Sequence, residues 1–137
     1  MKKIFRVFAF AVILAVPALA SAAGKVPAGF VALSESPLTW DQAQNYCRQQ
    51  GGKLPLIKGS DSLSSAADGA PIDGFGAIIG PWPAGLPQGM PAPGSCYWMG
   101  TRDGVSAGNS WVVYGLGGKV LTGTFPQSTP QRVVCVP

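Results

Sequence analysis

The clearest pattern of apolar and polar residues lies in residues 38–57, LTWDQAQNYCRQQGGKLPLI. Trp40, Ala43 and Cys47 recur at the spacing of one buried helix face, and most residues between them are polar. This pattern predicts an amphipathic helix whose apolar face contacts a core. Taken one by one, the same residues also fit an ordinary surface helix.

The sequence marks both ends of this helix. Thr39 is followed three residues later by Gln42, the spacing at which a hydroxyl caps the first turn and an amide reaches back. Gly51 and Gly52 favour the left-handed backbone that ends a helix. The helix is therefore predicted to begin after Thr39 and to end before the glycine pair.

Short apolar runs bounded by turn residues predict strands elsewhere in the chain. Gly117 and Gly118 stand between two such runs, and both can adopt positive φ, so a hairpin turn is predicted there. The predicted strands cover residues 29–34, 96–101, 110–116, 119–124 and 132–136.

A second, shorter helix is predicted after Ser60. This residue precedes Asp61, Leu63 and a run of small residues to Ala67, and Gly69 would close the helix. A serine cap followed by an acidic first turn is typical of a helix N-terminus.

Residues 69–95 have a different composition, because seven of these 27 residues are Gly and six are Pro. No regular element is expected in such a segment. It also contains several large apolar side chains, which disordered segments usually lack. It is therefore predicted to be a long loop packed over the domain, either functional or only a cover for the core.

Residues 1–23 begin with three basic residues, continue with an apolar run and end in small residues. This arrangement predicts a secretory signal peptide, followed by a single domain over residues 24–137. No membrane span is expected after signal cleavage, and the location is predicted to be secreted or periplasmic.

Charge and histidine content narrow the function classes. The net charge of +4 falls to +1 without residues 1–23, since these hold three of the ten basic residues and none of the six acidic ones. Nucleic acid is therefore not an expected partner. The chain has no His, which removes Ser-His and Cys-His nucleophilic pairs and imidazole zinc ligands.

Three cysteines, Cys47, Cys96 and Cys135, allow three alternative single disulfides in an exported protein. Their separations of 49 and 39 residues do not fit a zinc site, and no cofactor is expected. Cys96 is the candidate for a catalytic thiol if the other two cysteines pair. Its apolar neighbours favour an inert buried thiol instead.

Several short motifs together resemble the C-type-lectin-like superfamily, and within it a bacterial branch similar to the C-terminal domain of a collagen-like adhesin. The motifs are TWxxAxxYC in the first helix, GGKLP after it, YWMGT and SWVVYGL in later strands, and RVVCV at the end. The likeness extends from about Phe30 to Val136.

The resemblance implies an α+β fold in which two helices pack on twisted antiparallel strands with long loops. It also implies a disulfide between Cys47 and Cys135, which leaves Cys96 without a partner. The EPN-, QPD- and WND-like tripeptides of the calcium-dependent sugar site are missing. Calcium-dependent sugar binding is therefore not expected.

These observations predict a bacterial binding module, not an enzyme, that recognises a protein or glycan at a cell surface. The candidate ligand contacts are Trp82, Arg102, Asp103 and Asn109, because Arg offers a planar fork and Trp a stacking face. A solvated turn and a packed tryptophan are the alternatives for these residues. The alternative functions are a structural or assembly subunit of an envelope or pilus-like complex and a thiol-dependent enzyme using Cys96.

Overall fold

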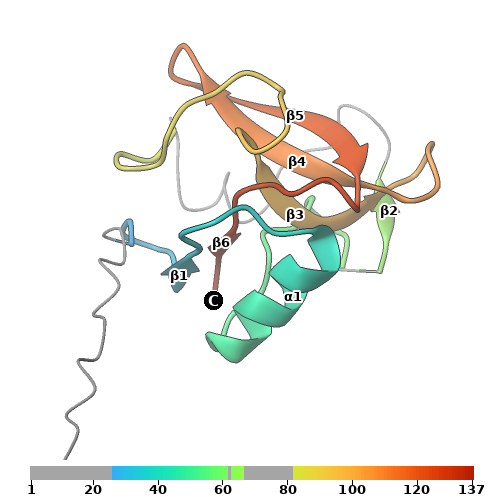
Figure 1. The fold of residues 1–137 in the computed structure, drawn as a ribbon, viewed down its shortest axis with the longest axis horizontal. Coiled ribbons are helices and arrows are strands. Elements are labelled where there is room, and N and C mark those ends of the chain that lie inside the picture. The colour runs from blue at the N-terminus through green and yellow to red at the C-terminus, as the bar shows by residue number, and fades with distance from the viewer. Residues whose placement is uncertain (1–25, 62, 67–81) are drawn as a thin grey trace, which may run out of the picture.

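A computed structural model describes residues 26–61, 63–66 and 82–137 as one helix and two small sheets (Figure 1). The predicted signal peptide and the first part of the Gly/Pro-rich loop lie outside these residues. The elements in chain order are β1 (Ala32–Leu33), α1 (Trp40–Gln49), β2 (Ser65–Ala66), β3 (Tyr97–Asp103), β4 (Asn109–Leu116), β5 (Lys119–Pro126) and β6 (Val134–Cys135).

The larger sheet has the strand order β2-β3-β4-β5. The β3–β4 and β4–β5 pairs are antiparallel, which confirms the predicted hairpins. Gly117 and Gly118 have φ values of 59° and 76°, so the turn between β4 and β5 uses the positive φ expected of them. Strand β2 pairs with β3 in the parallel direction, with Ser65 opposite Arg102.

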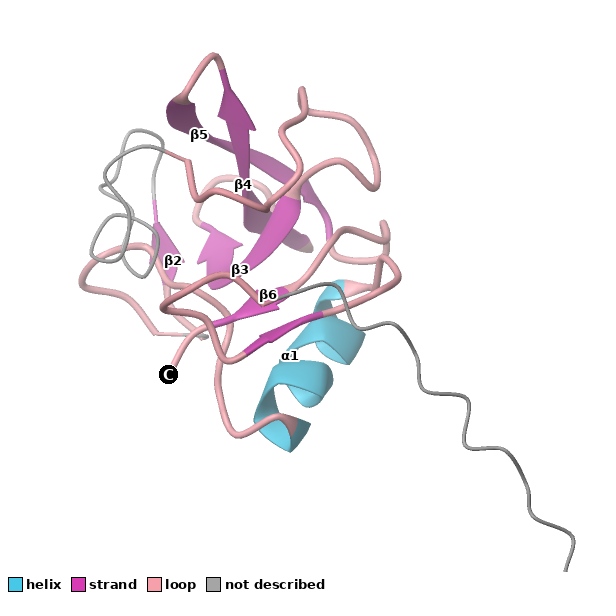
Figure 2. Ribbon diagram, turned by 90° about the vertical axis from the view of Figure 1, so that its left-hand side faces the viewer, coloured by secondary structure: helices cyan, strands magenta, loops and turns pink. Residues whose placement is uncertain are grey.

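The smaller sheet joins the two ends of the domain, because β1 pairs with β6 in the antiparallel direction (Figure 2). The residues around β6 also form single bridges with three other segments. Leu38 pairs with Gln131, Tyr97 with Arg132, and Lys53 with Val136. Residues 131–136 therefore pair with β1, with the residues that precede and follow α1, and with the first residue of β3.

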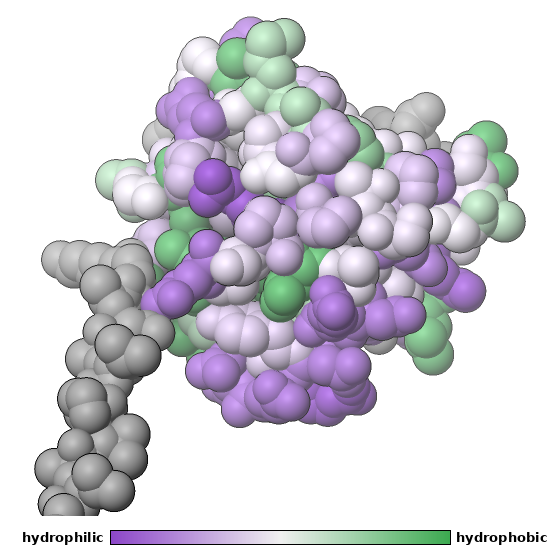
Figure 3. Space-filling model, viewed as in Figure 1, coloured by the Kyte–Doolittle hydropathy of each residue, from purple (hydrophilic) through white to green (hydrophobic). Residues whose placement is uncertain are grey.

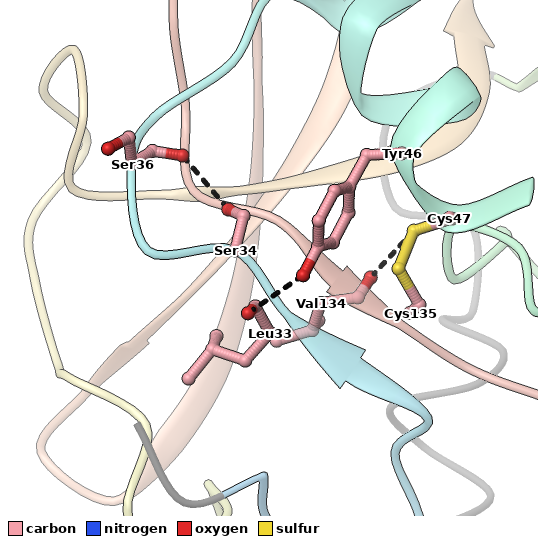
Figure 4. Close-up of a disulfide and its surroundings, with 7 residues drawn as sticks. All are labelled: Leu33, Ser34, Ser36, Tyr46, Cys47, Val134 and Cys135. Carbon is pink, nitrogen blue, oxygen red and sulfur yellow. Dashed lines mark hydrogen bonds between the residues drawn. A yellow bond between two sulfur atoms is a disulfide. The ribbon is translucent and has the colours of Figure 1, made fainter. Parts of the chain in front are cut away.

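A disulfide links the buried face of α1 to β6 (Figure 4). It joins Cys47 to Cys135 with a Cα–Cα distance of 5.3 Å and a separation of 88 residues, which confirms the pairing implied by the resemblance. Tyr46 lies beside it and donates a hydrogen bond of 3.0 Å from its hydroxyl to the Leu33 carbonyl. The disulfide is compatible with a location outside the cytoplasm.

Helix α1 has the predicted start and the predicted buried face. The Thr39 amide donates to Gln42 Oε1 over 3.1 Å, and Trp40, Ala43 and Cys47 are buried. Among the described residues, no helix is long and apolar enough to cross a membrane.

The prediction of a second helix over residues 60–67 is wrong, and with it the expectation of two helices on the strands. Asp61 Oδ1 accepts hydrogen bonds of 2.8 Å from the amides of Leu63 and Ser64, which close a local turn. The chain then extends and pairs with β3 through β2. Short polar side chains that bond nearby backbone compete with helix formation. Pairing with β3 then supplies backbone partners for residues 65–66 in the extended form. The regular elements of the described part are mostly strands, with one short helix, and the class remains α+β.

The core is built around tryptophans whose ring N–H groups reach backbone carbonyls. Trp98 donates to the Leu38 carbonyl and Trp40 to the Met99 carbonyl, each over 2.8 Å, so both fix α1 and its approach to β3. A buried indole with a satisfied N–H contributes apolar area without an unpaired donor. These bonds hold β3 in a fixed place, and with it the two charged residues at its end, Arg102 and Asp103.

Candidate ligand-binding site

A pocket of about 300 Å³ lies where β3 ends and β4 begins, and we call it the Arg102 pocket. Three of the four predicted contact residues, Arg102, Asp103 and Asn109, line it together. The complete lining is Ser65, Arg102, Asp103, Gly104, Val105, Ala107, Gly108 and Asn109.

The β3–β4 turn places these side chains close together. Asp103 is the last residue of β3, and its Oδ1 accepts a hydrogen bond of 2.9 Å from the Val105 amide. Asn109 is the first residue of β4, and its backbone N–H donates to the Ser106 carbonyl over 3.2 Å. An Asp that bonds the backbone two residues later is a common way to begin a turn. The turn therefore has a defined shape before any ligand arrives.

Ser65 of β2 also lines the pocket, and the residues before β2 hold Arg102. The Arg102 guanidinium donates to the Leu63 carbonyl from Nε over 3.1 Å and from Nη2 over 2.6 Å. The guanidinium has five N–H groups in a planar fork, so three of them remain for other acceptors. The exposed Arg102 side chain is thus held in place while it keeps donors for a ligand.

A second charged residue, Asp61, interacts with Arg102. Hydrogen bonds from Leu63 and Ser64 lower the pKa of Asp61, and the positive charge of Arg102 contributes in the same direction. Asp61 is therefore ionised at neutral pH. The chain before β2 therefore carries a negative charge that interacts with the Arg102 guanidinium.

Two large apolar side chains near the pocket are exposed to solvent. Leu63, whose carbonyl holds Arg102, is 69% exposed, and Val105, which lines the pocket, is 79% exposed. Val105 thus adds an exposed apolar side chain to the polar lining of the pocket. The pocket therefore offers hydrogen bonds and apolar contact together.

Trp82, the fourth predicted contact residue, lies in the core and does not join the Arg102 pocket. It is only 7% exposed, and its Nε1 donates to the Leu86 carbonyl over 3.0 Å. Its ring centroid is 5.7 Å from that of Tyr97. The packed-tryptophan alternative describes this residue.

Sequence reasoning did not find Ser65 or Val105. Ser65 lies in the segment that was expected to be helical, and its pairing with Arg102 depends on the contact between β2 and β3. Val105 could have been predicted to be exposed, because an apolar residue between Gly104 and Ser106 in a turn is not expected to be buried.

Cys96 is fully buried at the start of β3. Its sulfur lies 3.8 Å from Ser95 Oγ and 3.9 Å from the carbonyls of Met90 and Ala92. Burial raises the pKa of the thiol, although the Ala92 and Ser95 contacts act in the opposite direction. The thiolate fraction at neutral pH is therefore low. No cluster of His, Cys, Asp or Glu that could hold a metal ion occurs among the described residues.

Comparison of the chain with protein-family models, with curated proteins and with solved structures finds no match. The observations that bear on function are thus the chain's own, and the strongest is the convergence of Arg102, Asp103 and Asn109 in one pocket.

Proposed function

We propose that this protein is a secreted or periplasmic bacterial binding module that recognises a protein or glycan ligand at a cell surface, without calcium and without catalysis. The observation that carries the proposal is the Arg102 pocket, in which side chains from the ends of two strands and from β2 converge. The Cys47–Cys135 disulfide supports an oxidising compartment.

The chemistry of the pocket suits a polar ligand with an apolar portion. Arg102 offers N–H groups that match carboxylates or sulfates in pairs, and the amide of Asn109 can both donate and accept. Asp103 can accept from hydroxyl or amide donors through the oxygen that does not bond Val105. The exposed Leu63 and Val105 favour a protein surface over a bare sugar.

The same proposal includes membership of the bacterial branch of the C-type-lectin-like superfamily. The disulfide between the first helix and the last strand supports it, as do the motifs at residues 39–55 and 131–136. Ligand recognition in the absence of the calcium tripeptides would then rely on side chains such as those of the Arg102 pocket.

One observation favours a second candidate, an assembly subunit of an envelope or pilus-like complex. Strand β5 stands at the edge of the larger sheet as far as the structure describes it. An edge strand offers backbone groups to a strand from another subunit. This candidate predicts a stable oligomer in sedimentation, whereas the binding module needs none.

The first experiment is a protein and glycan array probed with the purified protein, followed by titration of the ligand that it identifies. Arg102→Gln should weaken binding of that ligand about tenfold or more, because a charge-assisted hydrogen bond is lost. Asn109→Ala should also weaken it. Both variants should still unfold cooperatively, and Arg102→Gln should unfold at a slightly lower temperature because it loses the hydrogen bonds to the Leu63 carbonyl.

Lys119→Gln is the control, since Lys119 is an exposed cation at the start of β5, outside the Arg102 pocket. It should leave the affinity within about twofold of the wild type. Equal affinity of Arg102→Gln and the wild type for the array ligand would contradict the proposed site.

A further inference from the structure

A second cleft, of about 360 Å³, lies between α1 and the chain that comes after it, and we call it the helix cleft. It shares no lining residue with the Arg102 pocket and is a separate site, whose Asp61 interacts electrostatically with Arg102. Hydrophilic residues dominate the face of the molecule over α1, as the lower part of Figure 3 shows. The residues that matter to its chemistry are Gln44, Arg48, Lys53, Leu54, Leu56 and Asp61.

Gly100 leaves the floor of the helix cleft free of a side chain, and Gly52 packs closely on the segment that follows β6. A Cβ built at Gly100 in β3 would lie 2.7 Å from Leu56 Cδ2, and one at Gly52 would lie 2.6 Å from the Val136 carbonyl oxygen. Distances this short require the neighbours to move. The floor therefore consists of backbone and of the Leu54 and Leu56 side chains.

Hydrogen bonds to two strands fix this floor. The amide and carbonyl of Lys53 bond to Val136 over 2.9 and 2.8 Å, and the Gly100 amide donates to the Pro55 carbonyl over 2.8 Å. The Ile57 amide donates to Thr101 Oγ1 over 3.0 Å. A ligand would thus bind a preformed surface, which lowers the entropic cost of binding.

The charged groups of the cleft are two cations and one anion. Arg48 and Lys53 are exposed, and the Arg48 guanidinium donates to the neutral side-chain amide of Asn45, which leaves its positive charge uncompensated by that contact. Asp61 carries the negative charge, and the amides of Leu63 and Ser64 already bond its Oδ1. The cleft therefore attracts one anionic group and offers an acceptor to a nearby donor.

The position of the cations follows from the helix. Gln44 and Arg48 are four residues apart on α1 and so lie on the same face one turn from each other. Arg48 is in the last turn of the helix, where a cation is also favoured by the helix dipole. A planar guanidinium and an ammonium that line the same cleft suit a carboxylate.

We propose that the helix cleft binds the C-terminal end of an extended peptide. The terminal carboxylate is held by Arg48 and Lys53, and an aliphatic terminal side chain packs on Leu54 and Leu56. The last peptide N–H groups of the ligand face Gln44 and Asp61. Capture of a terminal carboxylate is a known mode of peptide recognition, and the cleft volume is at the small end of the roughly 300–1,000 Å³ of ligand pockets.

The lining favours a peptide over an acidic sugar. Its apolar part is aliphatic, and none of its eight residues is aromatic, whereas a sugar ring would gain most from an aromatic face. An acidic sugar is therefore included in the experiment as a competing ligand.

The experiment titrates the ¹⁵N-labelled protein with acetyl-Gly-Ala-Leu that carries a free terminal carboxylate and, separately, with the same peptide as its terminal amide. The free acid should shift the amide signals of Arg48, Lys53 and Leu54 and bind at least about tenfold more tightly than the amide. Arg48→Gln and Lys53→Gln should each weaken the acid roughly fivefold, because each removes one charged donor.

Two matched variants serve as controls. Lys58→Gln and Lys119→Gln each remove an exposed cation outside both the helix cleft and the Arg102 pocket. Both should keep the affinity for the acid within about twofold of the wild type. The proposed function is tested by Arg102→Gln with the array ligand, so its failure and failure of the helix cleft are measured on different residues and with different ligands.

Three results would overturn the proposal. The first is equal affinity for the acid and the amide, and the second is the absence of signal changes around the helix cleft at about 10 mM peptide. The third is tighter binding of galacturonate than of the peptide at the same residues, which would assign the cleft to acidic sugars.

Discussion

Gly115 in β4 is the residue at which the Gly/Pro-rich loop is fixed to the larger sheet. The Trp82 ring covers it so closely that a Cβ at this position would lie 2.4 Å from Trp82 Cδ2. Its carbonyl accepts a hydrogen bond of 3.0 Å from the Gly89 amide. The loop crosses β4 near the top of Figure 1, and this contact needs a residue without a side chain.

Gly115→Ala should destabilise the protein by roughly 1–3 kcal/mol, because the added methyl group overpacks against a buried indole. The free energy of unfolding can be measured in urea, with tryptophan fluorescence as the probe. Gly123→Ala in β5 is the matched control, since a Cβ there meets only Val112 Cγ2 at 3.9 Å. Similar stability of the two variants would show that Trp82 does not pack on Gly115.

Trp82 also shows what the sequence could not reveal about single residues. The sequence around a loop tryptophan is the same whether its ring stacks on a ligand or packs against the protein itself. The difference is made by Gly115, which lies in another element and could be identified as its partner only from the fold. Arg102, Asp103 and Asn109, by contrast, flank one turn, so their proximity could be expected from the sequence.

Helix α1 was predictable because its signals are local. The spacing of Trp40, Ala43 and Cys47 and the Thr39–Gln42 pair specify a face and a start within ten residues of chain, and both are found in the structure. Periodicity and capping depend on neighbours along the chain rather than on the fold.

The capping bond of α1 can be tested directly. Gln42→Ala removes the acceptor of the Thr39 amide and should lower the free energy of unfolding by roughly 0.5–1 kcal/mol, as for other lost caps. Gln49→Ala makes the same chemical change at an exposed residue at the other end of the helix and should be neutral or slightly stabilising. An equal loss of stability in both variants would show that the effect does not come from the capping bond, because Ala has a higher helix propensity than Gln.

The segment after Ser60 was mispredicted because its local signals fit two structures. Asp61 accepts hydrogen bonds from backbone amides as a cap would, but these close a local turn. Ser60 Oγ donates to the Ile57 carbonyl over 2.6 Å instead of accepting from an amide. The chain beyond this turn forms a strand because β3 offers an open edge to it. That partner is distant in sequence, so β2 and its share of the Arg102 pocket could not be predicted.

At the scale of the whole molecule, the chain is held together by its C-terminal segment. Residues 131–136 pair with β1, with Leu38, with Lys53 and with Tyr97, and β6 also carries Cys135. These contacts link residues that are far apart in sequence. Such long-range pairing is entropically costly to form, and a covalent link between α1 and β6 reduces that cost.

Removal of the disulfide should therefore destabilise the protein more than the loss of any single hydrogen bond. For a loop of 88 residues the chain-entropy relation gives roughly 4.5 kcal/mol, a large share of the ~5–15 kcal/mol that stabilises a typical domain. The Cys47→Ala/Cys135→Ala double variant should lose about that free energy of unfolding in urea. Cys96→Ala is the control for loss of a buried sulfur and should cost only about 1 kcal/mol. If the double variant lost no more than Cys96→Ala, the hydrogen-bonded pairing of β6 alone would be sufficient to close the domain.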